Sequence, residues 1–492
     1  MNGFHVLLPI IFPLFVGLFL FRMDLESNRK EREMIIMMVL CLNVAFAMYA
    51  MFTPTTELTL FTFGHGFVVS LHIDWLSKIF GSMVSLLWVV TAIYAFEYMT
   101  HETGIRRFFS VFIMTYGVVL GIAFSGNFLT MYIFYECLTL VTLPLVMHAM
   151  DDKARYAGKV YILYMMFGAS LLLAGIIFFY NYSETMDFVY GGVLNLEMLQ
   201  GNESLVPGVF LLTFLGFGVK SALFPLHRWL PKASIAPTPV TAILHAVAVV
   251  KSGIFAIIRV LYFSFGVDYI KGTWVQNLLL IMTSITIVYG SFVALRTPHI
   301  KRRFAYSTIS NLSYILFGIV LMTPHGLQGA LLHMVYHAFI KITLFFSAGA
   351  ILYQTHKEYL YDIEGFGAKM PVVFAALTIS GISLIGIPPF AGFYSKWTLA
   401  TAAVESMNLY ADIGVVALMI SAVLTSLYIF YIIARAYYPR DQIYGEGYYD
   451  HVEDPNWYMK GTLLFLMICV IFLSCTPEFL LDYVATNLGM GY

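Results

Sequence analysis

The stretch GFGVKSALFPLHRWLP, residues 216–231, places Lys220 and then Pro225 inside an otherwise apolar segment. Proline lacks the backbone N–H of a helical residue and clashes with the preceding turn, so a helix is predicted to break at Pro225. Within a bilayer, a broken backbone is tolerated only where it is buried in protein or lines a cavity. The stretch therefore predicts a polar site in the membrane interior, beside a lysine.

The rest of the 492-residue chain has the composition of an integral membrane protein, with 60% hydrophobic and only 11% charged residues. A soluble protein carries about 25% charged residues. A spanning helix needs about 20 mostly apolar residues, and fourteen segments meet this requirement. They are residues 4–21, 34–53, 75–97, 108–124, 127–149, 160–180, 207–225, 238–263, 274–295, 304–322, 327–353, 371–399, 412–434 and 461–483. We therefore predict an all-α fold of about fourteen transmembrane helices, the first of them a retained span and not a signal peptide.

Lysine and arginine are distributed unevenly between the loops that join these spans. Of the 27 such residues, 20 lie in loops after odd-numbered spans, whereas the loops after even-numbered spans hold only Lys271. Cytoplasmic loops are enriched in Lys and Arg, so we predict that both termini face away from the cytoplasm. No basic cluster is large enough to follow a nucleic acid backbone, which excludes a nucleic-acid partner.

Six basic residues fall within the predicted spans, where a charge costs at least about 2.5 kcal/mol at the bilayer centre. Lys78 and Arg259 stand near span ends and are predicted to reach the headgroups with their long side chains. The other four stand deep in a span or beside a break and are predicted to have partners or water: Lys220, Lys251, Lys341 and Lys396. Glu136 adds a carboxylate to the middle of MYIFYECLTL, residues 131–140. Structural ion pairing and a proton relay both suit such groups, and for Glu136 and Lys220 we favour the relay.

A stripe of ionisable residues follows one predicted helix. The stretch HMVYHAFIKITLF, residues 333–345, carries His333, His337 and Lys341 at intervals of four, which puts all three on one helix face. Imidazole both gives and takes protons near pH 7, so this stripe favours a relay over packed polar residues. His245 is a weaker candidate, because its six-residue distance from Lys251 is not a same-face spacing.

Metal and cofactor sites are not predicted in this chain. Two histidines four residues apart suit a metal ion, but no carboxylate or cysteine accompanies them on that helix. The four cysteines lie apart in apolar segments and form no ligand set: Cys41, Cys137, Cys469 and Cys475.

A second interrupted helix is predicted in ISGISLIGIPPFAGFYSKW, residues 379–397, where Pro388 and Pro389 precede Lys396. Two interrupted helices at corresponding places in two halves are typical of transporters built from inverted repeats. We predict three N-terminal helices in residues 1–107, one five-helix repeat in 108–263, a second in 274–434, and a loop with a last helix in 435–492. The Tyr-rich acidic stretch GEGYYDHVEDP, residues 445–455, is predicted to be a surface loop.

Five stretches together resemble the antiporter-like subunits of respiratory complex I, membrane-bound hydrogenases and Mrp-type sodium/proton antiporters. The longest is GFGVKSALFPLHRWLPKASIAPTPVTAILHAVAVVKSGIFAIIR, residues 216–259. The others are HIDWLSKIF (72–80), HIKRRFAYSTISNLSY (299–314), HAFIKITLFFSAGAI (337–351) and GIPPFAGFYSKW (386–397). The resemblance covers nearly the whole chain.

This resemblance implies a fourteen-helix subunit with two inverted repeats and two half-channels, joined by a polar axis at the membrane midplane. It places the ion-translocating residues of the family at Glu136, Lys220, Lys251, Lys341 with His337 beside it, and Lys396. Lys396 is similar to the Mrp D subunit and the hydrogenase subunits, whereas some complex I members carry a glutamate there. Tyr135 stands where the family usually has a tryptophan. The implied location is a prokaryotic cell membrane.

Two functions remain open on this resemblance. The first is a proton- or sodium-translocating subunit of a redox-driven complex, with other membrane subunits and peripheral iron–sulfur or hydrogenase-like subunits as partners. The second is the D-type subunit of a multi-subunit Mrp Na⁺/H⁺ antiporter, with small membrane subunits as partners. The segment APTPVTAILHAV, residues 236–247, favours the first. In both, the chain has no redox or hydrolytic chemistry of its own, and a solute transporter is disfavoured because no organic substrate site stands out.

Overall fold

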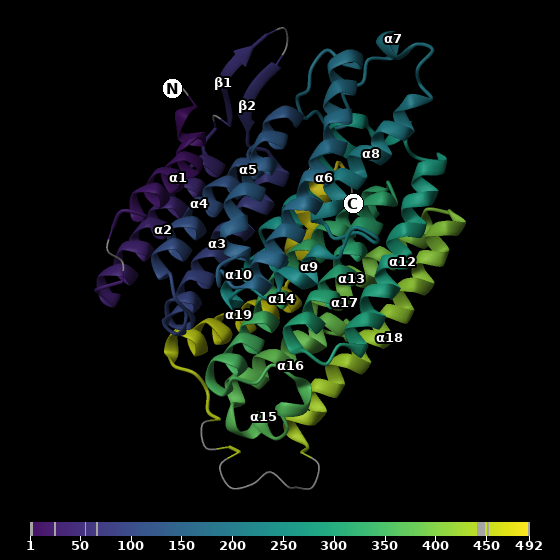
Figure 1. The fold of residues 1–492 in the computed structure, drawn as a ribbon. Helices are drawn as coiled ribbons and strands as arrows, with labels where there is room; N and C mark the ends of the chain where they lie inside the picture. Colours follow the sequence, from purple (N-terminus) through teal and green to yellow (C-terminus); the bar gives the residue numbers. More distant parts are fainter. Residues whose placement is uncertain are drawn as a thin grey trace. The chain divides into compact units, whose positions relative to one another are not determined.

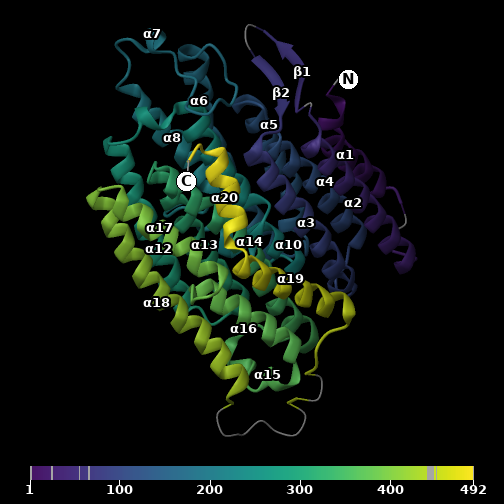
Figure 2. The same cartoon turned by 180° about the vertical axis from the view of Figure 1, so that it is seen from behind.

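The computed structural model of the chain describes residues 3–23, 26–54, 56–64, 67–439, 448–449 and 452–490, which are mostly helical (Figures 1 and 2). Among these residues, ten helices are long and apolar enough to cross a membrane. They are Arg29–Phe52, Trp75–His101, Ile105–Ala123, Phe128–Val146, Asp152–Tyr182, Thr238–Phe265, Trp274–Arg296, Pro324–Thr355, Leu409–Tyr437 and Trp457–Cys475. Residues 445–447 and 450–451 of the predicted surface loop at 445–455 lie outside the described residues.

The chain forms two compact units, each assembled from segments that lie far apart in the sequence. The first unit comprises Met1–Ala92, Glu102–Ala222 and Val247–Asn277. The second comprises Ile93–His101, Leu223–Ala246 and Leu278–Tyr492. The chain passes from one unit to the other within the segment that carries the first predicted break and again just after His245.

The first unit is a helical bundle with one β-hairpin. Its elements are η1 Phe4–Val6, α1 Leu8–Leu20, α2 Arg29–Phe52, β1 Glu57–Phe63, β2 Phe67–His72, most of α3 Trp75–Tyr98, α4 Ile105–Ala123, α5 Phe128–Val146, α6 Asp152–Tyr182, α7 Leu196–Leu199, α8 Leu205–Lys220, α11 Val249–Ile258, η3 Arg259–Phe265 and η4 Val267–Tyr269. Helix α11 packs against α4, α5 and α8, and every residue of α11 is buried. It therefore occupies the interior of this unit.

The second unit is built around the long helix α14. Its elements are the end of α3, η2 Met99–His101, α9 Trp229–Ala233, α10 Thr238–Ala246, most of α12 Trp274–Arg296, α13 Ile300–Val320, α14 Pro324–Thr355, η5 Leu360–Asp362, α15 Phe366–Lys369, α16 Pro371–Ile385, α17 Ala391–Glu405, α18 Leu409–Tyr437, α19 Trp457–Cys475 and α20 Pro477–Asn487. Helix α14 contacts α10, α13, α16, α17, α19 and α20 (Figure 2). Because protein surrounds it, its polar side chains lie away from lipid.

Side-chain caps fix where several of these helices begin. The Asn127 side chain accepts a hydrogen bond of 2.8 Å from the Thr130 N–H at the start of α5. Asp151 caps α6 in the same way, and Thr323 caps α14, where it accepts 3.0 Å from the Gly326 N–H. Such caps satisfy N–H groups that the helix itself leaves unpaired.

Two features differ from the all-α fold that the sequence predicts. The predicted connection at 54–73 contains the antiparallel hairpin of β1 and β2, because ELTLFTF and FVVSLH are rich in β-branched and aromatic residues (Figure 1). The predicted continuous span 238–263 is interrupted after Ala246, so α10 and α11 are separate helices, and a π-helix follows from Arg259. This interruption separates His245 from Lys251.

Candidate functional site

The first unit places Lys220 against the helix that carries Glu136. Lys220 is the last residue of α8 and is buried, and its Nζ donates a hydrogen bond to the backbone carbonyl of Tyr135 on α5. The same ammonium group lies 3.4 Å from the centre of the Tyr135 ring, a cation–π contact. The tyrosine that replaces the usual tryptophan therefore binds the lysine with both its main chain and its ring.

Glu136 stands one residue further along α5 and interacts electrostatically with Lys220. Within the described residues the two are not in ion-pair contact, and Glu136 Oε1 is buried without a hydrogen-bond partner there. Lys220 instead contacts the helix of Glu136 through the Tyr135 carbonyl.

Lys251 is fully buried on α11, the interior helix of the first unit. Gly253 allows α11 to approach α8 closely, since a Cβ there would lie 3.0 Å from the Phe217 carbonyl oxygen and 2.6 Å from the Ser221 Oγ. Lys251 and Lys220 thus stand on two helices in close backbone contact. The first unit accordingly holds Glu136, Lys220 and Lys251, on packed helices.

Lys341 lies at the centre of the second unit. It is fully buried on α14 and donates hydrogen bonds to the Ser307 Oγ, at 2.7 Å, and to the Phe304 carbonyl, at 3.2 Å. Both acceptors belong to α13, which lies beside α14 (Figure 1). Polar groups of a neighbouring helix therefore reduce the free-energy cost of holding this ammonium group in the membrane interior.

His245 belongs to the same unit as Lys341 and not to that of Lys251. It is buried on α10, its ring centre lies 4.9 Å from that of Phe345 on α14, and the charges of Lys341 and Lys301 act on it. Lys301, expected in a loop, lies in the first turn of α13 and donates a hydrogen bond of 3.0 Å to the Ala236 carbonyl. His245, the weaker candidate in the sequence, thus packs against α14, the helix that carries His333, His337 and Lys341.

The two histidines of the stripe continue along α14 from Lys341. The rings of His333 and His337 are 5.9 Å apart, and both side chains are buried. His333 makes a contact of 2.9 Å with the Ser395 hydroxyl through Nδ1 and one of 3.2 Å with the Asn311 side-chain oxygen through Nε2. The imidazole is therefore held at both nitrogens, one towards α13 and the other towards α17.

Lys396 follows Ser395 on α17, just after the second predicted break. Helix α16 ends at Ile385, the chain is irregular up to Phe390, and α17 begins at Ala391. Lys396 Nζ donates hydrogen bonds to the carbonyls of Leu384, at 2.7 Å, and Ile385, at 3.0 Å, which the break leaves without helical partners. Both predicted interruptions are present, and in this one the lysine satisfies the freed carbonyls.

Three polar residues of α13 belong to this arrangement but were not predicted. Ser307 binds Lys341, Asn311 binds His333, and the Tyr314 ring stacks on His333 while lying 5.0 Å from Lys396 Nζ. They recur at intervals of four and three residues, which is one helix face. This polar face within residues 299–314 is the signal that could have predicted them.

Arg259 corrects the prediction that its side chain reaches the headgroups. It is 1% exposed, and its guanidinium donates to both Asp74 carboxylate oxygens, at 2.5 and 2.6 Å, and to the Ser77 hydroxyl, at 2.8 Å. Burial alone would raise the pKa of Asp74, but the charge and hydrogen bonds of Arg259 lower it to about 2. Since an unfolded aspartate has a pKa of about 3.9, this ion pair stabilises the fold fully above pH 4 and is lost only as the pH falls towards 2.

Asp74→Asn is expected to destabilise the folded complex by about 3–5 kcal/mol, because it leaves the buried Arg259 guanidinium without a counter-charge. The midpoint of thermal unfolding of the purified protein measures this loss. Glu405→Gln is the matched control, because its contact with His325, at 2.8 Å, is exposed and such pairs contribute little. Equal unfolding midpoints for the two variants would show that the buried ion pair does not stabilise the fold.

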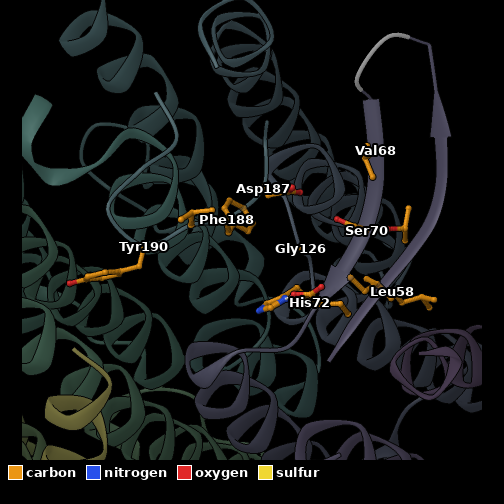
Figure 3. Close-up of a pocket in the computed structure, with 12 residues that line it drawn as sticks. Leu58, Val68, Ser70, His72, Gly126, Asp187, Phe188 and Tyr190 are labelled. Carbon is orange, nitrogen blue, oxygen red and sulfur yellow. Dashed lines mark ion pairs between the residues drawn. The ribbon is translucent and has the colours of Figure 1, made fainter. Parts of the chain in front are cut away.

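A cavity of about 540 Å³ lies in the first unit between the β-hairpin and residues 187–190 (Figure 3). His72 and Asp187 line it, and His72 Nδ1 lies 3.0 Å from Glu57 Oε1. Phe188 also lines it, and the centre of its ring lies 5.4 Å from the Arg259 guanidinium. Phe188 thus lies between the cavity and the Asp74–Arg259 ion pair. No sequence pattern predicted this cavity.

Matches to two family descriptions cover the predicted site residues and the Asp74–Arg259 pair. Residues 125–425 match the family described as "NADH:quinone oxidoreductase/Mrp antiporter, TM". Residues 61–109 match the family described as "NADH-Ubiquinone oxidoreductase (complex I), chain 5 N-terminus". The first match alone includes every predicted site residue.

Individual relatives support both names in that description. The chain is 31% identical to NADH-quinone oxidoreductase subunit N of Desulforudis audaxviator, over 72% of this chain and 70% of the relative. It is 28% identical to NADH-quinone oxidoreductase subunit L of Rickettsia bellii, over 97% of this chain and 74% of the relative. It is also 30% identical to a Na⁺/H⁺ antiporter subunit of Alkalihalophilus pseudofirmus, over 74% of this chain but only 47% of that longer protein.

Two solved structures share the fold. A chain of the membrane-bound sulfane sulfur reductase, an archaeal respiratory membrane complex, superposes with a TM-score of 0.83 at 23% identity. A chain of the Mrp complex from Dietzia sp. DQ12-45-1b superposes with a TM-score of 0.82 at 20% identity. Each comparison covers 98% of this chain and 96% of the other. On the family match over most of its length, the chain belongs to the NADH:quinone oxidoreductase/Mrp antiporter transmembrane family.

Proposed function

We propose that this chain translocates protons or sodium ions as an antiporter-like subunit of a multi-subunit membrane complex. The observation that carries the proposal is the row of ionisable groups in the second unit, from His245 through Lys341, His337 and His333, which are buried, to Lys396, which is half-buried. Each is expensive to keep in a membrane interior, and intramembrane ionisable residues typically mark ion pathways. The row combines lysine with imidazole side chains, and both kinds of group accept and release protons.

The proposed route runs along the facing sides of α13, α14 and α17. Hydrogen bonds to the Ser307 hydroxyl and the Phe304 carbonyl stabilise the ammonium form of Lys341. The proton of this group passes to His337 and then to His333. From His333 it passes through the Ser395 hydroxyl towards Lys396, whose ammonium form is stabilised by the carbonyls of the broken helix. Water must complete the steps that no side chain spans.

In the first unit, Glu136 and Lys220 are proposed to act as a switch. While Glu136 is ionised, its charge favours the ammonium form of Lys220, and removing that charge withdraws the support. The Tyr135 carbonyl and ring provide a second position for the same ammonium group. The lysine can then release its proton towards Lys251 on the neighbouring helix.

The finer architecture is part of this proposal. Three shorter apolar helices, Leu8–Leu20, Leu205–Lys220 and Pro371–Ile385, together with α13 bring the ten long helices to fourteen spans. We propose two inverted repeats in residues 108–263 and 274–434, and both termini on the non-cytoplasmic side of a prokaryotic cell membrane. The two broken helices and the distribution of Lys and Arg support these assignments.

A redox-driven complex and an Mrp-type antiporter are both compatible with the relatives, which carry both kinds of name. We propose the redox-driven complex, with no cofactor in this chain and iron–sulfur partner subunits. The test is to purify the native complex gently and to measure bound iron and acid-labile sulfide. We expect both in amounts comparable to the protein. A metal-free complex that contains only membrane subunits would instead identify an Mrp-type antiporter.

A further inference from the structure

Glu97 is a buried carboxylate that the proposed route does not include. It stands near the end of α3 in the second unit, is 8% exposed, and accepts a hydrogen bond of 2.7 Å from the Tyr353 hydroxyl of α14. The same hydroxyl lies 3.2 Å from the hydroxyl of Thr100. Because a buried carboxylate is costly, a neutral hydroxyl that both donates and accepts is a suitable partner for a group that changes protonation.

Tyr353 also connects this carboxylate to the surface. The exposed ring of His101 stacks on the Tyr353 ring, with centres 4.0 Å apart and planes 11° apart. The ring of His356, also exposed, lies 6.3 Å from that of His101. Histidine exchanges protons with water readily near neutral pH. The exposed imidazoles, the Tyr353 phenol and the buried Glu97 carboxylate therefore form one cluster that connects to solvent at the imidazoles.

Tyr98 continues these polar contacts towards α10. Its hydroxyl accepts a hydrogen bond of 3.1 Å from the hydroxyl of Thr238, the first residue of that helix. His245 stands seven residues later on the same helix, about 10 Å along its axis and on the same face. Lys301 contacts the Ala236 carbonyl just before α10, and its charge acts on His245. Polar groups thus stand at both ends of α10.

We propose that Glu97 and Tyr353 form the proton intake port of the second unit, an inference that rests on the proposed function. The Glu97 carboxylate takes a proton from water at the His101 end and becomes a neutral acid. It then gives the proton inward, through the hydroxyls of Tyr353 and Tyr98 and through water along α10 to His245, and returns to the carboxylate. The port follows an odd-numbered span, so it opens on the side rich in Lys and Arg.

The test compares variants of the native complex reconstituted into liposomes with a pH-sensitive dye inside. Glu97→Gln keeps the size and the hydrogen bond from Tyr353 but cannot carry the proton, and Tyr353→Phe keeps the ring stacked on His101 but removes the hydroxyl. Each is expected to slow proton flux at least about 10-fold under an imposed gradient. Glu358→Gln is the matched control, since Glu358 is another carboxylate of this unit in contact with a histidine, His299, at 3.4 Å. Its flux is expected to stay within twofold of wild type.

Lys341→Met, measured in parallel, separates the port from the function on which it rests. Loss of flux in Lys341→Met together with wild-type flux in Glu97→Gln and Tyr353→Phe would overturn the port and leave the proposed function standing. Wild-type flux in all of these variants would overturn both. If Glu97→Gln fails to assemble, Tyr353→Phe decides by the same criterion. Slow flux in both port variants, with normal flux in Glu358→Gln, is the result expected.

Discussion

Lys341→Met is expected to lower ion translocation by the complex at least about 100-fold, with normal assembly. Methionine has nearly the length of lysine and no charge, so it fills the same space on α14 and removes only the hydrogen bonds to the Ser307 hydroxyl and the Phe304 carbonyl. The route from His245 to Lys396 then lacks the one ammonium group between its histidines. Native membrane vesicles with an external pH dye report the loss as a missing signal when the driving reaction or gradient is applied.

Lys271→Met is the control for this variant. Lys271 is exposed in the loop before α12, so the same substitution there removes an equal charge without touching the route. Normal translocation is expected. If Lys271→Met lowered translocation as much as Lys341→Met does, the effect would come from general charge loss and not from the row of ionisable groups.

Lys220→Met and Glu136→Gln are each expected to lower translocation at least about 10-fold, and the double variant to be no slower than the slower single variant. The reason is that the two groups act as one switch, so the second change removes nothing further. The measurement is the same vesicle assay, with the amount of assembled complex determined by gel filtration. Glu184→Gln, an exposed carboxylate of the same unit bonded to Asn195 at 2.9 Å, provides the control. Independent, multiplying effects would contradict the switch.

The broken helices and the buried lysines of the site could be predicted from the sequence alone. A proline close to a lysine in an apolar stretch indicates an interrupted helix with a polar site. The breaks lie where Pro225, Pro388 and Pro389 predicted them. A regular four-residue spacing likewise placed His333, His337 and Lys341 on one face of α14. These predictions depend only on residues that are close together in the chain, and a single sequence shows all of these.

Contacts between distant segments could not be predicted in this way. Arg259 stands near a span end and resembles a residue that reaches for headgroups, yet its partner Asp74 is 185 residues away. His245 was judged by its spacing from Lys251, but the helix between them is interrupted and His245 packs with α14 instead. The polar face of α13 can be recognised in the sequence, but only the structure shows that Ser307 contacts Lys341.

The β-hairpin was missed for a different reason. Its strands alternate only weakly between buried and exposed residues, and β1 is mostly exposed. A search for long apolar segments therefore assigns these residues to a connection between spans. Its pattern of β-branched and aromatic residues was the available signal.

The most direct test of the proposed ion pathway is proton and sodium flux through purified complex in liposomes, with wild type and Lys341→Met at equal complex content. Purification removes every other transporter of the native membrane, so the flux belongs to this complex alone. The pathway predicts that the variant retains no more than about 1% of the wild-type flux of the translocated ion. Wild-type flux in the Lys341→Met complex would contradict an ion pathway through the second unit.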